Sequence, residues 1–347
     1  MILFNCDYSE GAHPSVLQKL IQTNLEQTPG YGADAYCRQA AHQIQQACHA
    51  PQADVHFLCG GTQTNLTVIA ACLRPYQCVL SADSGHINVH ETGAIEATGH
   101  RIYPLPAKEG KITAEQISRA CQSHWADENP EFAPQPKLVY LSFPTEYGTL
   151  YTKAELSAIR RVCDENNLFL FIDGARLGYG LAAKENDVTL PDIAAIADVF
   201  YIGGTKLGAL LGEAVVITNA KLKKDFRYFM KQKGAILAKG RVLGLQFSAL
   251  FENNLYLQLA RHANEMALQI RHVCEAAGFS SPYQSPTNQQ FFIIPNKILA
   301  KLEENYVFSH IRAINRNETL IRICTSGATR EEDLKQLSLD IQKYAGK

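Results

Sequence analysis

The segment that decides the fold is Leu168-Phe169-Leu170-Phe171-Ile172-Asp173-Gly174-Ala175-Arg176-Leu177. Its first five residues are all apolar, which is typical of a strand buried on both faces of a parallel sheet. An aspartate, a glycine and an arginine follow at the carboxyl end of this strand, where open α/β sheets bind their ligands. The segment therefore predicts a central strand of an α/β sheet with a ligand site at its end.

Other apolar runs, rich in β-branched and aromatic residues, extend this sheet, and segments with helical periodicity separate them. They occupy residues 54–59, 137–142 and 199–203. Strands that alternate with helices in this way predict a central, mostly parallel sheet covered by helices on both faces. The predicted fold class is α/β.

Two helices are expected ahead of the sheet, at residues 14–26 and 33–49, the second because of an apolar stripe with i, i+3, i+4, i+7 spacing. Residues 120–136 contain three prolines and show little periodicity. They therefore predict a long loop inside the large domain.

The chain changes character after residue 240. A long helix, strands at residues 290–295 and 320–324, and a closing helix are expected there, with Thr329 and Glu332 as an N-terminal capping box. We expect three parts, an N-terminal arm, a large domain, and a linking helix with a small α+β domain, at residues 1–15, 16–240 and 241–347.

Composition narrows the classes of function. Lys plus Arg number 33 and Asp plus Glu 34, a formal charge of -1 that argues against nucleic-acid binding through a basic face. The most apolar stretch, residues 199–217, is interrupted by Lys206 and Glu213, so no membrane span is expected. The N-terminus lacks the basic and apolar regions of a secretion signal, so we expect a cytoplasmic protein. The ten cysteines form no C-x-x-C pair and lie in apolar segments, so we expect them to be buried free thiols.

A lysine in a glycine-rich turn is the sharpest chemical signal. Lys206 follows an apolar strand in Ile202-Gly203-Gly204-Thr205-Lys206-Leu207-Gly208. Burial and neighbouring cations can lower the pKa of a lysine until its amine forms a Schiff base. The alternative is a lysine that extends to solvent or binds a phosphate. Asp173, after its own strand, strengthens the first interpretation, because an aspartate keeps the pyridine nitrogen of pyridoxal 5'-phosphate (PLP) protonated.

A glycine turn, Cys59-Gly60-Gly61-Thr62-Gln63-Thr64-Asn65, opens a predicted helix. Backbone N–H groups at a helix N-terminus bind phosphate, and the Thr62 hydroxyl can add a hydrogen bond. The turn lacks the Gly-Lys-Ser/Thr of a Walker A loop and does not match the G-x-G-x-x-G pattern of dinucleotide-binding folds, so taken alone it is weak evidence.

Two histidines four residues apart, His86 and His90, lie beside Glu91 and invite a zinc interpretation. The order H-E-x-x-H is absent and no third ligand is evident, so no metal is expected. An imidazole can instead stack on a cofactor ring and act there as an acid or base. Arg322, in a strand that is otherwise apolar, needs an anionic partner, either a substrate carboxylate or a structural salt bridge.

Taken in order, these motifs resemble the threonine aldolase family, fold-type I enzymes that depend on PLP, within the β-eliminating lyase group. The resemblance covers nearly the whole chain. It is carried by residues 5–14, 30–34, 60–65, 85–93, 144–149, 173–177, 203–206 and 322–326.

The resemblance implies a role for each matched residue. Lys206 would hold PLP covalently, Asp173 would pair with the pyridine nitrogen, and His86 would stack over the ring. Arg176 would lie near the phenolic oxygen and the substrate, and would complete the catalytic set. The phosphate would be held by residues of the glycine turn, Gly60, Gly61, Thr62 and Gln63.

Other matched residues would reach the substrate or a second subunit. Ser9 and Arg322, with Arg176, would bind the amino acid carboxylate. The family also places phosphate contacts from a neighbouring subunit after the Schiff-base lysine, for which Lys239 and Arg241 are the candidates. The implied assembly is a homodimer or homotetramer with active sites shared between subunits.

Two departures from the family are evident. Many members have Ser-Lys-Gly around the lysine, whereas this chain has Thr205-Lys206-Leu207. A second active-site histidine that could serve as general base has no counterpart, since His124 lies in the predicted loop.

The expected reaction is retro-aldol cleavage of L-threonine or L-allo-threonine to glycine and acetaldehyde, with His86, directly or through a water, removing the β-hydroxyl proton. Three alternatives remain open: a β-eliminating lyase or a phenylserine- or serine-type aldolase with the same cofactor, a catalytically silent PLP-binding protein, and a metal aldolase using His86 and His90.

Overall fold

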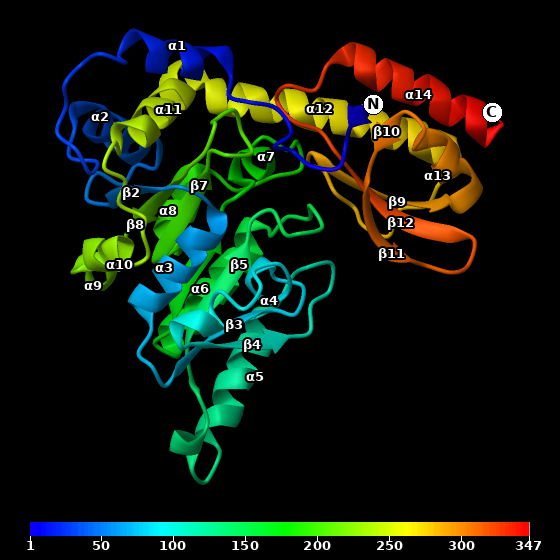
Figure 1. Cartoon of the computed structure of the whole chain (residues 1–347). Coiled ribbons are helices and arrows are strands. Elements are labelled where there is room, and N and C mark those ends of the chain that lie inside the picture. Colours follow the sequence, from blue (N-terminus) through cyan, green and yellow to red (C-terminus); the bar gives the residue numbers. More distant parts are fainter. Residues whose placement is uncertain (347) are drawn as a thin grey trace.

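The computed structural model describes residues 1–346, and a seven-stranded sheet lies at its centre (Figure 1). The strand order is β2-β8-β7-β6-β5-β3-β4. Strands β4, β3, β5, β6 and β7 are parallel, whereas β8 is antiparallel to β7 and to β2. The strands are β2 (Asp54–Leu58), β3 (Gln77–Ala82), β4 (Arg101–Leu105), β5 (Gln135–Ser142), β6 (Phe169–Asp173), β7 (Val199–Gly203) and β8 (Glu213–Ile217). The predicted α/β class with a mostly parallel sheet is confirmed.

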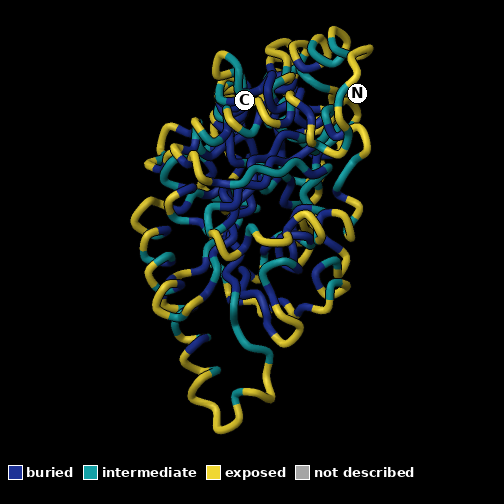
Figure 2. The backbone as a smooth tube through the Cα atoms, turned by 90° about the vertical axis from the view of Figure 1, so that its left-hand side faces the viewer, coloured by how far each residue is buried: buried dark blue, intermediate teal, exposed yellow. Residues whose placement is uncertain are grey.

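Both faces of this sheet are buried, because successive side chains of a strand point to opposite faces. On β6, Leu170 and Ile172 join one apolar cluster and Phe171 joins another; on β7, Phe200 and Tyr201 divide in the same way. Figure 2 shows the resulting buried centre under an exposed periphery. The covering helices are α1 (Pro14–Gln22), α2 (Ala35–Ala47), α3 (Gly61–Cys72), α4 (His86–Val89), α5 (Ala114–Trp125), α6 (Lys153–Glu165), α7 (Leu177–Leu181), α8 (Leu190–Ile196), α9 (Ala220–Lys223), α10 (Phe226–Gln232) and α11 (Arg241–Phe251).

A smaller antiparallel sheet lies at the other end of the long helix α12 (Leu255–Ala276), which contacts α7 and β9 (Figure 1). Its order is β11-β12-β9, and it has its own apolar cluster. Its elements are β9 (Gln289–Pro295), α13 (Asn296–Leu302), β11 (Ser309–Ala313), β12 (Glu318–Cys324) and α14 (Glu331–Ala345). The long helix, the strands β9 and β12 and the closing helix α14 are those expected from the sequence, whereas α13 and β11 were not predicted. The exact domain boundaries stay a prediction.

The N-terminal arm is held by this smaller part. Strand β1 (Ile2–Leu3) pairs in parallel with β10 (Tyr306–Val307), and the Cys324 N–H donates to the Phe4 carbonyl, 2.7 Å. Phe4 is buried in the same apolar cluster. The next residues of the arm are thereby directed toward the large sheet.

Two local predictions are wrong. The expected loop at residues 120–136 contains the last two turns of α5, because Thr113 caps that helix and Ile117 and Cys121 bury one of its faces; a 3₁₀ turn follows at Pro130–Phe132. The expected capping box does not form, since α14 begins at Glu331 and the Thr329 hydroxyl accepts from the Ser326 N–H instead.

All ten cysteines are free, and seven of them are buried, as their scattered apolar settings predicted. Across residues 1–346 we find no helix with the length and apolar character needed to cross a bilayer.

The contact between α2 and α11 predicts the effect of one substitution. A Cβ atom on Gly244 would lie 2.6 Å from the Cys37 Cα atom. Because this Cβ would meet backbone atoms, overpacking should cost the upper part of its usual range, about 2–3 kcal/mol. The gain in helix propensity over glycine is about 1 kcal/mol, so Gly244→Ala should destabilise by about 1–2 kcal/mol. Thermal unfolding would measure it, with Gly11→Ala as the control, since a Cβ there meets nothing within 4 Å. Equal melting temperatures for both variants would contradict the close packing.

Candidate active site

The candidate site is a cavity at the carboxyl ends of β5, β6 and β7. Because these strands are parallel neighbours, the residues that follow them meet at one edge of the sheet. The structure brings together five of the predicted residues there: Lys206, Asp173, Arg176, His86 and Gly61. The remaining lining residues are Asn65, Ser142, Pro144, Thr145, Glu146, Ala175 and Tyr201.

Asp173, the last residue of β6, accepts hydrogen bonds on both oxygens. Oδ1 accepts from the Tyr201 hydroxyl, 2.5 Å, and Oδ2 accepts from the Tyr140 hydroxyl, 2.5 Å, and from Asn65 Nδ2, 3.1 Å. Burial disfavours the carboxylate, but the charge of His86 and these donors outweigh it and lower the pKa of Asp173. Asp173 therefore remains an anion, as a partner for a protonated pyridine nitrogen must. The two tyrosines and Asn65 were missed, because each belongs to a strand or helix that resembles ordinary core.

Lys206 lies in the turn after β7, directly beside the turn that follows β6. The Gly203 N–H donates to the Gly174 carbonyl, 2.9 Å, and a Cβ on Gly174 would lie 1.8 Å from the Tyr201 carbonyl oxygen. Removal of the Lys206 amine from water and the positive charge of Arg176 lower the pKa of Lys206. A larger fraction of this lysine is therefore neutral and nucleophilic at neutral pH.

A buried carboxyl group on β8 lies behind this turn. Glu213 accepts from the Gly204 N–H, 3.2 Å, and from the Thr205 hydroxyl, 3.0 Å. Burial raises the pKa of Glu213, against the attraction of Lys206. The Thr205 hydroxyl thus binds Glu213, and this contact explains why a residue with a hydroxyl group precedes the lysine.

Arg176 is fixed by the N-terminal arm. Its Nε donates to Asp7 Oδ2, 2.7 Å, its Nη2 donates to Asp7 Oδ1, 2.9 Å, and Asn288 Nδ2 also donates to Oδ2, 2.9 Å. Burial disfavours the Asp7 carboxylate, but Arg176 and Lys206 overcome this and lower the pKa of Asp7 to about 2. Asp7 was not predicted as a site residue, because no local pattern in the sequence links it to Arg176.

His86 begins α4 and is oriented by a buried carboxylate. Its Nδ1 lies 2.7 Å from Glu91 Oε1, which also accepts from Asn65 Nδ2, 2.7 Å. This bond assigns the proton to Nδ1 in the neutral ring and leaves Nε2 as an acceptor. The His90 ring is 5.5 Å away, and no group of three His, Cys, Asp or Glu residues suited to a metal ion occurs among residues 1–346.

The start of α3 has the free backbone N–H groups that the predicted phosphate cradle requires, and its role stays a prediction. Gly60 is its N-cap and provides no side-chain hydrogen bond, so the first N–H groups of the helix are available to an anion. Gln63 is already engaged, since it accepts from the Cys59 N–H and donates to the Lys233 carbonyl, both at 3.1 Å. The Lys206 amine, the Asp173 carboxylate and this helix N-terminus fit the aldehyde, the pyridine nitrogen and the phosphate of PLP, respectively.

Six of the predicted cofactor- or substrate-binding residues are outside this lining, namely Gly60, Thr62, Gln63, Arg322, Ser9 and Lys239. Arg322 on β12 donates to Gln289 Oε1, 3.1 Å, and to the Asn5 carbonyl, 3.0 Å, while its buried Nε has no partner. It forms no ion pair among residues 1–346, so the salt-bridge alternative is not what the structure contains. Ser9 is exposed and contacts Cys6, and Lys239 is exposed on the surface.

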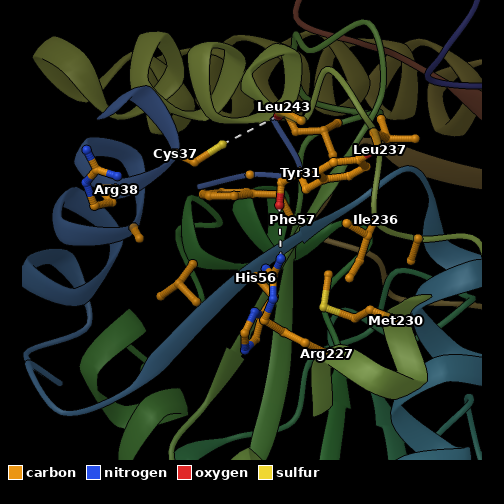
Figure 3. A pocket seen from close by; sticks show the side chains of 15 residues that line it. Tyr31, Cys37, Arg38, His56, Phe57, Arg227, Met230, Ile236, Leu237 and Leu243 are labelled. Carbon is orange, nitrogen blue, oxygen red and sulfur yellow. Dashed lines mark hydrogen bonds between the residues drawn. The ribbon is translucent and has the colours of Figure 1, made fainter. Parts of the chain in front are cut away.

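A separate cavity lies beside the segment that carries Lys239 and Arg241 (Figure 3). Arg227 crosses it and donates to the Tyr31 carbonyl, 3.0 Å, and Cys37 donates to the Gly240 carbonyl. Arg241 donates to the carbonyls of Thr23 and Glu26 in the same chain. Neither Lys239 nor Arg241 thus reaches the phosphate cradle of its own subunit.

Fold and site together define a lyase of the fold-type I class. The chain belongs to the beta-eliminating lyase family, whose model matches residues 7–297.

Relatives and solved structures agree with this family. The low specificity L-threonine aldolase of Pseudomonas aeruginosa is 28% identical over 99% of this chain and 98% of its own. That of Saccharomyces cerevisiae is 28% identical over 69% of this chain and 60% of its own. A solved Leishmania major threonine aldolase has a TM-score of 0.97 and 41% identity, covering 99% of this chain and 100% of that one. Thermus thermophilus aspartate aminotransferase, at 13% identity and TM-score 0.72, covers 99% of this chain and 91% of that one, and shares the fold.

The arm contact predicts a pH-dependent contribution to stability. Folding lowers the pKa of Asp7 from 3.8 to about 2, so Asp7→Asn should lower the free energy of unfolding at pH 7 by about 2 kcal/mol. The contribution is complete above about pH 5 and is lost as the pH falls through 3.8 toward 2.

Urea unfolding of both proteins at pH 7 and pH 3 would measure this effect. The difference between wild type and variant should shrink by about 1 kcal/mol at pH 3. Asp127→Asn, at an exposed position, serves as the control. A difference that stays constant between the two pH values would refute the ion pair.

Proposed function

We propose that this chain is a PLP-dependent threonine aldolase that cleaves L-threonine and L-allo-threonine to glycine and acetaldehyde. The observation that carries the proposal is the convergence of the Lys206 amine and the Asp173 carboxylate on one cavity. The 41% identity to the Leishmania major threonine aldolase along the full chain supports the substrate class.

The chain's own residues then have distinct tasks. Lys206 would hold the cofactor through its side-chain amine. Asp173 keeps the pyridine nitrogen protonated, and the bound cofactor supplies the electron sink for the bond that breaks. His86, held by Glu91, covers the ring, and the first N–H groups of α3 hold the phosphate.

Two arginines orient the amino acid carboxylate. Arg176 is locked by Asp7 and can bind only with the N–H groups that this contact leaves free. Arg322 donates to neutral acceptors and forms no ion pair among residues 1–346, which suits a role with a substrate carboxylate. Ser9 completes this subsite. By fixing the carboxylate, these residues would set the orientation of the Cα–Cβ bond and so select the bond that breaks.

The second candidate function is β-elimination, which the name of the matched family favours. It would use the same cofactor but release ammonia and pyruvate from L-serine. The two reactions differ in their products, so they are separable in one assay.

We also propose a homodimer or homotetramer with sites shared between subunits, located in the cytoplasm. Residues 1–15, 16–240 and 241–347 form its arm, large domain and small domain. Helix α1 and the turn after it expose Leu17, Ile21 and Leu25, at 40%, 75% and 93%, which supports a contact there with another chain. Free thiols suit a reducing compartment.

Product analysis tests the proposed reaction. The PLP-loaded protein should release equimolar glycine and acetaldehyde from L-threonine and from L-allo-threonine, and Lys206→Ala should lower kcat at least about 1,000-fold because the covalent attachment is lost. Borohydride reduction followed by mass spectrometry should add the cofactor mass to the wild type only. Ammonia and pyruvate as the main products would favour the second candidate.

The shared site predicts an effect of a surface residue. Lys239→Ala should raise the apparent Kd for PLP several-fold, because the phosphate loses a cation from the neighbouring subunit. Lys335→Ala, equally exposed, should not change it. Fluorescence titration with PLP and light scattering would measure affinity and assembly. A monomer with full affinity would contradict the shared site.

A further inference from the structure

Glu146 is a carboxyl group of the cavity that the proposed reaction does not yet use. It lies in the loop after β5 and lines the cavity with His86 and Lys206. Glu146 belongs to the matched segment 144–149 but was not predicted as a site residue. Its place on the cavity wall follows from the three-dimensional arrangement.

The loop that carries Glu146 is held at both ends. The Thr145 N–H donates to the Thr149 carbonyl, 3.0 Å, and the hydroxyls of these two residues lie 2.6 Å apart. The Thr149 hydroxyl also donates to the Glu109 carbonyl, 2.6 Å. Tyr147 stacks on Tyr283, with ring centroids 4.1 Å apart. A loop fixed in this way presents the Glu146 side chain in one position.

One oxygen of this carboxyl group is anchored and the other is not. Glu146 Oε1 accepts from the His86 backbone N–H, 2.7 Å, and from the Ser142 hydroxyl, 2.6 Å. No hydrogen bond to Oε2 occurs among residues 1–346, and Oε2 is not a buried unpartnered atom. Oε2 is therefore available to a group that enters the cavity.

The other carboxyl groups near the cavity are less suited to accept a proton. Asp173 receives donors on both oxygens and has a lowered pKa. Glu91 Oε1 is taken up by His86 and Asn65, and its Oε2 is closed off from solvent. Glu146 differs from both, because burial and the negative charge of Asp173 raise its pKa toward the range where proton transfer is efficient.

Several titratable groups surround Glu146. They are His86 of α4, Asp173 of β6, Tyr140 of β5, Tyr147 and Tyr151 of the same loop region, and Arg176 and Lys206 across the cavity. The tyrosines have raised pKa values through burial. Glu213, whose pKa burial raises to about 8, lies behind the Lys206 turn and does not line the cavity. Of the two carboxyl groups in the cavity lining, Glu146 is thus the one with a raised pKa and Asp173 the one with a lowered pKa.

We propose that Glu146 is a catalytic residue that accepts the proton of the substrate's β-hydroxyl group on Oε2. This inference rests on the proposed aldolase function. The hydroxyl O–H bond breaks and its proton passes to Oε2, while its electron pair forms the C=O bond of the aldehyde. The Cα–Cβ bond breaks, and its electron pair moves to Cα, which later takes up a proton to give glycine. Glu146 then returns its proton to water.

The proposal assigns a positioning role to its neighbours. Ser142 and the His86 N–H hold Oε1 and so direct Oε2 into the cavity. The His86 ring remains the cover of the cofactor. In this proposal the Glu146 carboxylate takes the role of general base for which the chain has no second histidine.

Glu146→Gln tests the role. The amide keeps an acceptor for the His86 N–H but cannot take up a proton. We expect kcat for L-threonine cleavage to fall at least about 100-fold. The fall of wild-type kcat at acid pH, where Glu146 becomes protonated, should disappear from the residual activity. Glu146→Asp should recover part of the rate, and Glu109→Gln, an exposed carboxyl group outside the cavity, should behave as wild type.

Exchange of the α-proton of glycine with deuterated water, followed by NMR, separates a catalytic from a structural role. This exchange uses PLP, Lys206 and Asp173 but involves no β-hydroxyl group. We expect Glu146→Gln to retain exchange within about three-fold and to keep the absorption band and affinity of bound PLP, although cleavage is lost.

The outcomes are distinguishable. Cleavage by Glu146→Gln within about three-fold of wild type would overturn the role of Glu146 and leave the proposed function intact. Equal losses of cleavage and exchange would overturn it as well, since they would indicate a disturbed cavity. A wild-type protein that exchanges glycine but cleaves no β-hydroxy amino acid would overturn the proposed function, and the role of Glu146 with it.

Discussion

The contact between two backbone turns underlies the whole site. The turns after β6 and β7 are joined by the bond from the Gly203 N–H to the Gly174 carbonyl, and neither glycine leaves room for a Cβ atom. This close approach brings Asp173 and Lys206 to one cavity although they are far apart in the chain. Asp173 and Lys206, the two residues proposed to hold the cofactor, are therefore positioned by the main chain of these turns.

Charge in the cavity is arranged in compensated groups. Asp7 neutralises Arg176, Glu213 lies behind Lys206, and hydroxyl and amide donors stabilise Asp173. The Asp7–Arg176 pair and the donors to Asp173 thereby offset the cost of burying these charges, on the order of several kcal/mol for an unpaired ion. Asn65 connects Asp173 with Glu91 and thus with His86, so Asp173 and His86 share one hydrogen-bond network.

Sequence reasoning reached the residues whose chemistry is local. Lys206, Asp173 and the glycine turn at Gly60 each follow a strand, and the ends of parallel strands meet by topology alone. Asp7 and Glu146 escaped it, because their functions depend on contacts with Arg176 and His86 that no spacing in the chain encodes. The capping box expected at Thr329 does not form because of a local competitor: the Ser326 backbone N–H donates to the same hydroxyl.

The pairing of β1 with β10 has a consequence for the order in which the molecule is completed. Residues 2–3 obtain their partners only when residues 306–307 have been synthesised, and Asp7 reaches Arg176 through this pairing. The large sheet can thus form early during translation, while Arg176 lacks its counter-ion until the chain is almost finished. The contact between Asp7 and Arg176 is thus among the last parts of the molecule to form, so a truncated chain with an intact sheet would still lack it.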